Sequence, residues 1–214
     1  MKLPFKPSRR TVLTLLSIGV LTVVGAVLFL RQSSPDDGFG GRTESLTTSV
    51  EVPSETPITG DYSVPNGQPL SIEIAARGIK GNLQKVGIDQ HKAVAAPNNV
   101  NLAGWFSDSA LPGRKGLSII DGHVSGVSRH GVFYNLNKVA AGDKVVITYG
   151  DKTTRTYTAF ATRAVATNEA QNYLFDQDPR VTEQLNIITC GGRYNSATKG
   201  YEKRVIVSAK LESV

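Results

Sequence analysis

The feature that most restricts the fold of this chain is a series of short strand-forming runs that follows residue 68. These runs are rich in Val, Ile, Thr and Tyr: PLSIEIAA, GLSIID, DKVVITYG, TRTYTAFATRAV, LNIITC and RVIVSAKL. Gly, Pro, Asn and Asp separate them, which is typical of turns, and short helices are expected only at 168–175 and within 131–139. Because short strands need protected edges, the pattern predicts a mainly β fold, a closed mixed barrel of about eight strands.

The β-rich part of the chain, residues 67–214, has the length of one typical domain with its own core. Before it, residues 31–66 consist mainly of Ser, Thr, Pro, Gly and acidic residues, with few bulky apolar side chains. Such a segment buries too little apolar surface to offset the entropy of ordering. It is therefore expected to be a flexible linker.

An uncharged apolar run at 11–30 has the length of a membrane-spanning helix. Four basic residues lie in the segment 1–10 before it, whereas Arg31 alone follows it closely. The positive-inside rule then assigns residues 1–10 to the cytoplasm and the β-rich domain to the outside. A cleaved signal peptide is the alternative, but its apolar core is usually only about 7–15 residues long. We therefore expect a single-pass protein of the cell membrane with an extracellular domain.

The chain carries a formal net charge of +6, which by itself can indicate a nucleic-acid-binding protein. Several of the positive charges, however, flank the apolar run, and the domain lacks a stripe of interleaved aromatic and basic side chains. An extracellular location also argues against a nucleic-acid partner. Attraction to an anionic cell surface is the simpler interpretation of the charge.

Cys190 is the only cysteine of the chain. Exported domains normally use cysteines in pairs, so a single one indicates a reactive thiol or an intermolecular bridge. The strand-forming run from Leu185 ends in Thr189-Cys190-Gly191-Gly192, which would put the thiol at the rim of a sheet beside flexible backbone. The alternative is a buried cysteine that acts as a small hydrophobic side chain.

A reactive thiol needs a proton-transfer partner, because the thiolate is the nucleophile. Of the three histidines, His91 and His130 lie in polar segments that are typical of surface loops. His123 instead follows an apolar strand-forming run through Gly122, a position in which a side chain faces a cleft at the end of a strand. His123 is therefore the expected acid–base residue.

Arg204 is expected to open the last strand of the chain. If this strand pairs with the one that starts at Leu185, the connection returns Arg204 to the vicinity of Cys190. A guanidinium is always charged and donates several hydrogen bonds in a fixed geometry, so it can stabilise an oxyanion. Arg193 and Lys203 are alternatives for this role.

Together these residues resemble the sortase family of cysteine transpeptidases. The sortase signature, Thr-Leu-x-Thr-Cys with a later arginine on the neighbouring strand, stands here as NIITC at 186–190 followed by Arg204. The Thr-Cys pair is intact, whereas Asn186 and Ile187 replace the first Thr and the Leu. With GWFSDSALPGRKG and IIDGHVSG upstream, the chain looks most similar to the actinobacterial-type class F sortases. Asp121 departs from the small residue that is common before the Gly-His pair.

The resemblance covers about residues 70–211 and implies an eight-stranded barrel in which Cys190 attacks the Thr–Gly bond of an LPXTG-like sorting signal. It implies that His123 protonates the departing amine and that Arg204 stabilises the oxyanion. The partners would be sorting-signal proteins and an amine acceptor such as a peptidoglycan precursor, and no cofactor or metal is expected. The segment from about 163 to 184 would shape the substrate groove. The expected substrate-binding residues are Thr189, Val165, Ala166, Leu174 and Phe175.

Two alternatives stay open at this point. An L,D-transpeptidase also uses an extracytoplasmic Cys and His on a β-rich fold, but its cysteine motif is Ser-x-Gly-Cys, which the sequence around Cys190 does not match. An anchored surface-binding domain without catalytic activity would have Cys190 in its core.

Overall fold

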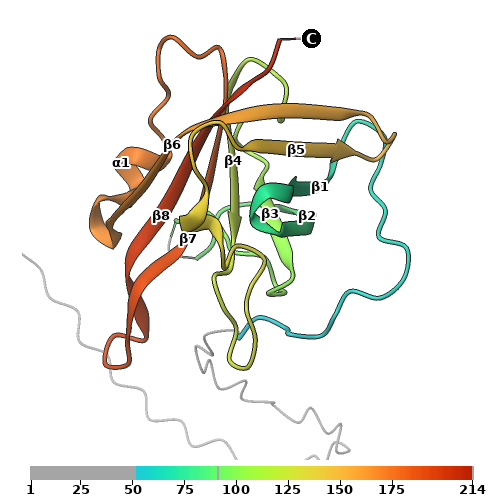
Figure 1. Cartoon of the computed structure of the whole chain (residues 1–214). Helices are drawn as coiled ribbons and strands as arrows, with labels where there is room; N and C mark the ends of the chain where they lie inside the picture. The colour runs from blue at the N-terminus through green and yellow to red at the C-terminus, as the bar shows by residue number, and fades with distance from the viewer. Residues whose placement is uncertain (1–51, 91, 214) are drawn as a thin grey trace, which may run out of the picture. The chain divides into compact units, whose positions relative to one another are not determined.

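Strand pairing closes the β-rich part of the chain into a barrel (Figure 1). The computed structural model describes residues 52–90 and 92–213. Around the barrel the strands follow the order β1-β2-β3-β4-β7-β8-β6-β5, and β5 pairs with β1 to close it. The elements are β1 (Pro69–Ile74), η1 (Ala75–Arg77), β2 (Ile79–Val86), β3 (Leu102–Phe106), β4 (Gly116–Gly122), η2 (Leu136–Lys138), β5 (Lys144–Tyr149), β6 (Thr154–Ala166), η3 (Thr167–Glu169), α1 (Ala170–Leu174), β7 (Glu183–Asn195) and β8 (Gly200–Leu211).

The predicted barrel is confirmed, including its mixed character, because β2–β3 and β4–β7 are parallel pairs and the other pairs are antiparallel. Each of the six strand-forming runs corresponds to a strand, and the short helix expected at 168–175 is α1. Strands β2 and β3 were not predicted. All five residues of β3 are buried, so this strand lacks the alternation that marks a half-exposed strand.

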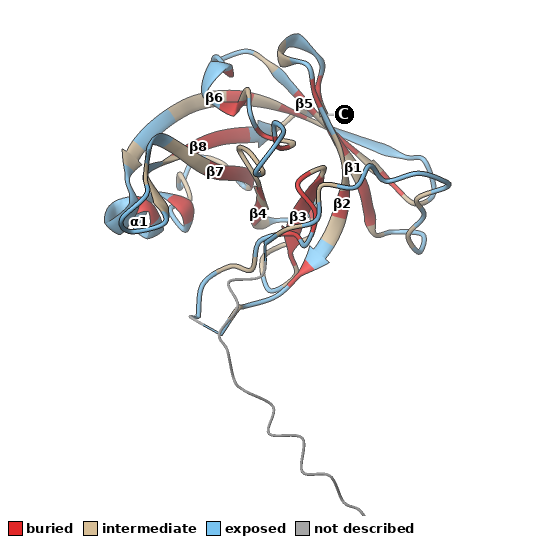
Figure 2. Cartoon of the chain, turned by 90° about the horizontal axis from the view of Figure 1, so that it is seen from below, coloured by how far each residue is buried: buried red, intermediate tan, exposed pale blue. Residues whose placement is uncertain are grey.

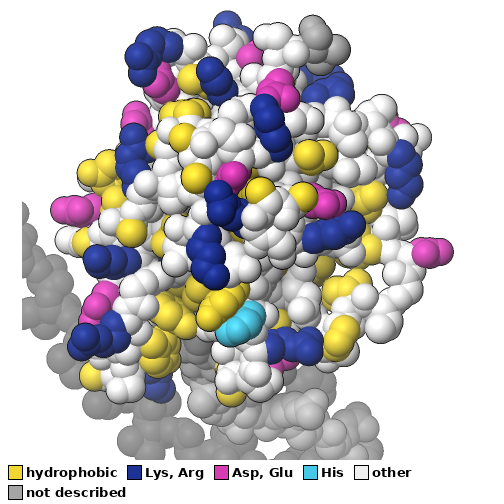
Figure 3. All heavy atoms as spheres, viewed as in Figure 1, with side chains coloured by type: hydrophobic (Ala, Val, Ile, Leu, Met, Phe, Trp, Pro, Cys, Tyr) yellow, Lys and Arg dark blue, Asp and Glu magenta, His cyan; other side chains and the backbone are white. Residues whose placement is uncertain are grey.

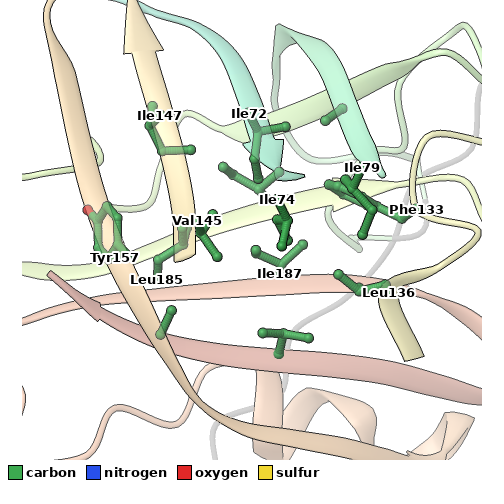
Figure 4. Close-up of a cluster of buried hydrophobic side chains, with 14 of the residues drawn as sticks. Ile72, Ile74, Ile79, Phe133, Leu136, Val145, Ile147, Tyr157, Leu185 and Ile187 are labelled. Atoms are coloured by element: carbon green, nitrogen blue, oxygen red, sulfur yellow. The ribbon is translucent and has the colours of Figure 1, made fainter. Parts of the chain in front are cut away.

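Alternating apolar side chains fill the interior of the barrel (Figure 4). Strand β1, for example, points Ile72 and Ile74 inward, and both are fully buried. Tyr157 brings a hydroxyl into this core, and burial raises its pKa to about 12. The interior is therefore a packed core and not a ligand channel.

A second apolar cluster lies outside the barrel, between α1 and the outer faces of the strands. It consists of Phe106, Ile119, Ala170, Leu174, Ile188 and Ile206. Figure 2 shows buried residues on β7, β8 and α1, where these elements pack together. This cluster holds α1 beside the part of β7 and β8 that carries the candidate site residues.

The hairpin of β7 and β8 is longer than the sequence predicts. Strand β7 was expected to end at Cys190 and β8 to begin at Arg204, but the strands extend to Asn195 and from Gly200. Pairing resumes beyond a register shift with Tyr194 opposite Tyr201, and the side chain of Asn195 accepts a hydrogen bond in the turn. The thiol therefore lies within a strand, beside a bulge, and not at a strand end.

Residues 52–66, part of the predicted linker, contact the barrel. Ser54 forms an isolated parallel bridge with Asn99, and the hydroxyl of Tyr62 donates a hydrogen bond of 2.8 Å to the carbonyl of Leu83. These bonds need backbone and polar groups only, so apolar patterning does not reveal them. The domain boundary at residue 67 remains a prediction. The contacts show that parts of the predicted linker are bound to the folded domain.

The predicted membrane span at 11–30, the tail at 1–10 and the linker up to residue 51 lie outside the described residues. Among the residues that the structure describes, no helix is long and apolar enough to cross a membrane. On the face of the domain shown in Figure 3, Lys and Arg side chains are interspersed with Asp and Glu side chains.

Candidate active site

A buried hydroxyl connects the strand of the candidate nucleophile to the strand that precedes the candidate base. Thr189 on β7 is 2% exposed, and its Oγ1 donates a hydrogen bond of 2.7 Å to the carbonyl of Gly122, the last residue of β4. Cys190 follows Thr189, and His123 follows Gly122. The parallel pairing of β4 and β7 thus brings together two chain segments that are far apart in the sequence.

Cys190 lies opposite Arg204 in the antiparallel pairing of β7 and β8. Directly paired residues point to the same face of a sheet, and side chains two residues apart on one strand share that face. Asp121 pairs with Ile188 on β7, two residues before Cys190. Asp121, Cys190 and Arg204 therefore share the outer face of the barrel, beside the cluster under α1.

Cys190 is partly exposed and borders two cavities. The first, of about 530 Å³, lies between α1, the loop that follows β2, the end of β4 and the middle parts of β7 and β8. Its lining includes Asp121, Leu174, Phe175 and Arg204. The second, of about 290 Å³, lies toward the segment 124–138 and the β7–β8 hairpin. The thiol can thus be approached from two sides.

Burial and two charged neighbours determine how easily Cys190 ionises. Burial raises the pKa of the thiol, the positive charge of Arg204 lowers it, and the carboxylate of Asp121 raises it. Burial also raises the pKa of Asp121 to about 7, although the Gly122 N–H and Arg204 oppose that shift. The Asp121 carboxylate accepts a hydrogen bond of 2.7 Å from the Gly122 N–H. The resting site therefore favours the neutral thiol.

Among the residues that the structure describes, the guanidinium of Arg204 forms its hydrogen bonds through one nitrogen. Its Nη1 donates to the hydroxyl of Thr167 at 3.1 Å and to the carbonyls of Tyr201 at 3.2 Å and Lys203 at 3.0 Å. The side chain also lines the first cavity, next to Cys190. Such a guanidinium is oriented by one nitrogen and can donate from the others to an oxyanion.

His123 immediately follows β4, as predicted, and a backbone carbonyl orients its ring. Its Nε2 lies 2.7 Å from the carbonyl oxygen of Pro97. Because a carbonyl oxygen only accepts, Nε2 carries the hydrogen, and in a neutral ring Nδ1 is the nitrogen that can accept a proton. Gly131 packs against the backbone of this residue, and a Cβ there would lie 2.2 Å from the His123 carbonyl oxygen. The ring and the backbone of His123 are thus both held by neighbouring loops.

The other histidines differ from His123. His130 is exposed and stacks on Tyr134 with 3.4 Å between ring centroids. His91 lies outside the described residues.

The expected substrate-binding residues divide into two groups. Leu174 and Phe175 line the first cavity, and Thr189 lines the second. Val165 packs against the cluster under α1, and Ala166 is an exposed residue paired with Lys203, so neither lines a cavity beside Cys190.

Several residues of the site were not predicted from the sequence. The loop after β2 contributes Lys92, Val94 and Ala96 to the first cavity, and Tyr134 and Tyr201 line the second. The run of Pro and Asn at 97–99 indicated only a turn, although the carbonyl of Pro97 orients His123. Within the described part of the chain, no group of three or more His, Cys, Asp or Glu side chains could hold a metal ion.

Comparison with known proteins gives one domain family. A family model of the sortase domain matches residues 72–212. No curated protein sequence matches the chain significantly.

Several solved structures share the fold. A lid mutant of sortase A from Corynebacterium diphtheriae is 23% identical with a TM-score of 0.52, over 71% of this chain and 73% of that chain. Sortase A from Listeria monocytogenes is 21% identical with a TM-score of 0.51, over 72% and 89% of the two chains. Sortase C-1 from Actinomyces oris is 18% identical with a TM-score of 0.50, over 68% and 73%.

Proposed function

The chain belongs to the sortase family and is a cysteine transpeptidase, and from this premise we propose that it cleaves an LPXTG-like sorting signal between Thr and Gly. The acyl part would then be joined to an amine. The observation that supports this proposal best is the direct pairing of Cys190 with Arg204. The bond between Thr189 and Gly122 joins the residues that precede Cys190 and His123. The set provides a nucleophile, a cation for the oxyanion and a proton carrier.

In the first half-reaction the Cys190 thiol gives its proton to His123, and the resulting thiolate forms a bond to the threonine carbonyl carbon. The electron pair of the carbonyl moves to its oxygen, and the guanidinium of Arg204 stabilises this oxyanion by charge-assisted hydrogen bonds. When the carbonyl reforms, the C–N bond breaks and the His123 imidazolium gives its proton to the departing glycine amine. The products of this step are a thioester at Cys190 and a neutral His123.

In the second half-reaction the acceptor amine attacks the thioester carbon. His123 accepts the proton that the amine loses, and the C–S bond breaks to return the thiolate. The new amide links the sorted protein to the acceptor, for which a peptidoglycan precursor or another protein is the proposed partner. We also propose that the enzyme is similar to the class F sortases, and this part of the proposal rests on the sequence motifs alone.

The two cavities suggest separate approaches for the two substrates. We assign the donor peptide to the first cavity, because Arg204 and the apolar side chains of Leu174 and Phe175 line it. The acceptor amine would then arrive through the second cavity. The apolar run at 11–30 supports an anchor in the cell membrane, with residues 1–10 in the cytoplasm and the enzyme domain outside.

Mass spectrometry of the protein after incubation with LPXTG peptides tests this proposal. We expect a covalent adduct of the acyl part on Cys190 and its release by glycinamide as a new amide. Cys190→Ala should form neither product and should retain its Tm, since a partly exposed thiol contributes little packing. Turnover by Cys190→Ala would refute the proposal. Crosslinking of muropeptides without any LPXTG cleavage would instead favour an L,D-transpeptidase activity.

A further inference from the structure

The first part of the described chain is bound to the tip of the loop that follows His123. The carboxylate of Glu55 accepts hydrogen bonds from the backbone N–H of Val127, from the N–H of Ser128 at 3.1 Å and from the Ser128 hydroxyl. Arg129 donates to the carbonyl of Glu55 at 2.8 Å. The hydrogen bonds to the carboxylate, above all the one from the Ser128 hydroxyl, lower the pKa of Glu55. Figure 1 shows the cyan start of the described chain passing this yellow-green loop.

The loop that Glu55 binds is a small hairpin that leads directly back to His123. Its tip is closed by a bond from the Gly126 N–H to the Arg129 carbonyl, and Ser125 and His130 form a bridge. At its base, the Gly131 N–H donates to the Val124 carbonyl at 3.0 Å. The Phe133 N–H then donates to the His123 carbonyl, also at 3.0 Å. Displacement of the tip is thus transmitted to the backbone of His123 through a short hydrogen-bonded ladder.

The same segment also binds the loop that holds the ring of His123. The Ser54 N–H donates to the Asn98 carbonyl at 2.8 Å, and the Val100 N–H donates to the Ser54 carbonyl at 2.9 Å. The amide of Asn99 donates to the Thr56 carbonyl at 2.9 Å. Pro97, whose carbonyl accepts from His123 Nε2, directly precedes these residues. Residues 54–56 therefore contact both loops that orient His123.

We propose that residues 54–56 are a positioning element for the acid–base histidine and that Glu55 is its principal positioning residue. The inference rests on the proposed function, because it concerns the proton transfer assigned to His123. In the described part of the chain, none of the hydrogen bonds given above for this segment goes to Cys190 or to a residue that lines the first cavity. Its loss should therefore slow the chemical step without weakening binding of the donor peptide. A consequence is that the catalytic unit begins before residue 67.

Gly126 provides an independent way to displace the Glu55 carboxylate. A Cβ at Gly126 would lie 2.1 Å from Glu55 Oε1, which is the far end of a flexible side chain and moves more readily than backbone. The φ angle of Gly126 is outside the range that disfavours other residues. Gly126→Ala should therefore release Glu55, with a shift of only a few tenths of an ångström in the side chain of Val100, whose Cγ1 would lie 3.1 Å from the new Cβ.

The test measures kcat and KM with an LPXTG peptide and glycinamide for the full chain and its variants Glu55→Ala, Gly126→Ala and the double variant. Misplacing a catalytic group by about 1 Å can cost roughly 10²-fold, so we expect a loss in kcat of about tenfold or more in each single variant. KM for the donor peptide and the rate of Cys190 alkylation should stay at the wild-type values. The double variant should lose no more than Gly126→Ala, because both changes break one interaction. Glu73→Ala, which removes a partly exposed carboxylate on β1 that pairs with Lys80, is the matched control and should keep wild-type kcat.

Wild-type kcat in Glu55→Ala would overturn the inference, as would an effect confined to KM. Losses that add in the double variant would show that Gly126 and Glu55 act independently, and would also overturn it. A fall in Tm without a fall in kcat would assign the segment a purely structural role. Failure of the proposed function looks different, since Cys190→Ala would then remain active.

Discussion

Cys190 and Arg204 lie directly opposite each other in the pairing of β7 and β8, so backbone hydrogen bonds determine the relative position of the two residues. The pairing resumes beyond a register shift and reaches the end of the hairpin. Hydrogen bonds from Nη1 to Thr167, Tyr201 and Lys203 then orient the guanidinium. This arrangement makes the contribution of each group measurable by single substitutions.

Arg204→Lys should not be a conservative change. Lysine keeps the positive charge but loses the fixed set of donors that bind both the Thr167 hydroxyl and an oxyanion. Loss of one oxyanion donor typically costs a factor of about 10²–10³ in kcat, and both Arg204→Lys and Arg204→Ala should show a loss of this size. Steady-state kinetics with an LPXTG peptide measure it. Arg193→Ala and Lys203→Ala are the controls, and near-wild-type kcat in Arg204→Lys would contradict the proposed role.

His123→Ala should fold normally and lose at least about 10²-fold in kcat, the typical contribution of a positioned acid–base group. His130→Ala is the control, because His130 is exposed and stacks on Tyr134. We expect His91→Ala to have little effect as well. A comparable loss in either control variant would mean that another histidine transfers the proton.

Asp121→Asn should make Cys190 more acidic. The carboxylate raises the pKa of the thiol, so its removal favours the thiolate. The pH dependence of alkylation by iodoacetamide reports this pKa, and its midpoint should move down in Asp121→Asn. In Arg204→Ala the midpoint should move up, because a positive charge that favours the thiolate is lost. Equal midpoints in the wild type and both variants would contradict this electrostatic coupling.

Asp121 should also make the stability of the domain depend on pH. Its pKa in the folded protein is about 7, above the ordinary value of 3.8, so the folded state binds the proton more tightly than the unfolded state. Between these values stability falls as pH rises, because the carboxyl group is ionised in the unfolded chain but neutral in the folded protein, so folding must take up a proton. The difference in Tm between Asp121→Asn and the wild type should be small below pH 3.8 and should grow until about pH 7. A difference that does not change with pH would contradict the assignment.

Thr189→Val should affect both stability and catalysis, because it removes the hydrogen bond to the Gly122 carbonyl next to His123. An unsatisfied buried acceptor typically costs about 1–3 kcal/mol, and thermal unfolding should show a lower Tm. Thr162→Val is the control, since Thr162 makes a partly buried bond of 2.8 Å to the carbonyl of Val139. The control should lose stability, though less than Thr189→Val, and should keep kcat. Equal kcat in the two variants would show that the bond of Thr189 is purely structural.

The sequence predicts the fold well where side chains alternate along a strand. The inward and outward residues of β1 and β5 are examples, whereas the fully buried β3 shows no period and was missed. The three residues proposed for catalysis could be found because their chemistry depends on residue type. The Pro97 carbonyl could not, since every residue has a carbonyl and only the folded chain determines which one faces a histidine.

The same reasoning explains why the contacts of residues 54–56 were not predicted. The segment binds through backbone groups and a single carboxylate, Glu55, and it has no apolar pattern that would indicate packing. Low hydrophobicity predicts disorder because apolar burial normally offsets the entropy of ordering. Here a dense set of hydrogen bonds to neighbouring loops holds the segment against the domain instead.

The single, partly exposed Cys190 also determines how the protein responds to oxidants. The chain contains no second thiol that could convert a sulfenic acid into an intramolecular disulfide, so reversal of oxidation requires a reductant from outside the molecule. Oxidation proceeds through the thiolate, and burial together with Asp121 keeps the resting thiol neutral. The same electrostatics that restrain the nucleophile before substrate arrives therefore also slow its irreversible loss to peroxides.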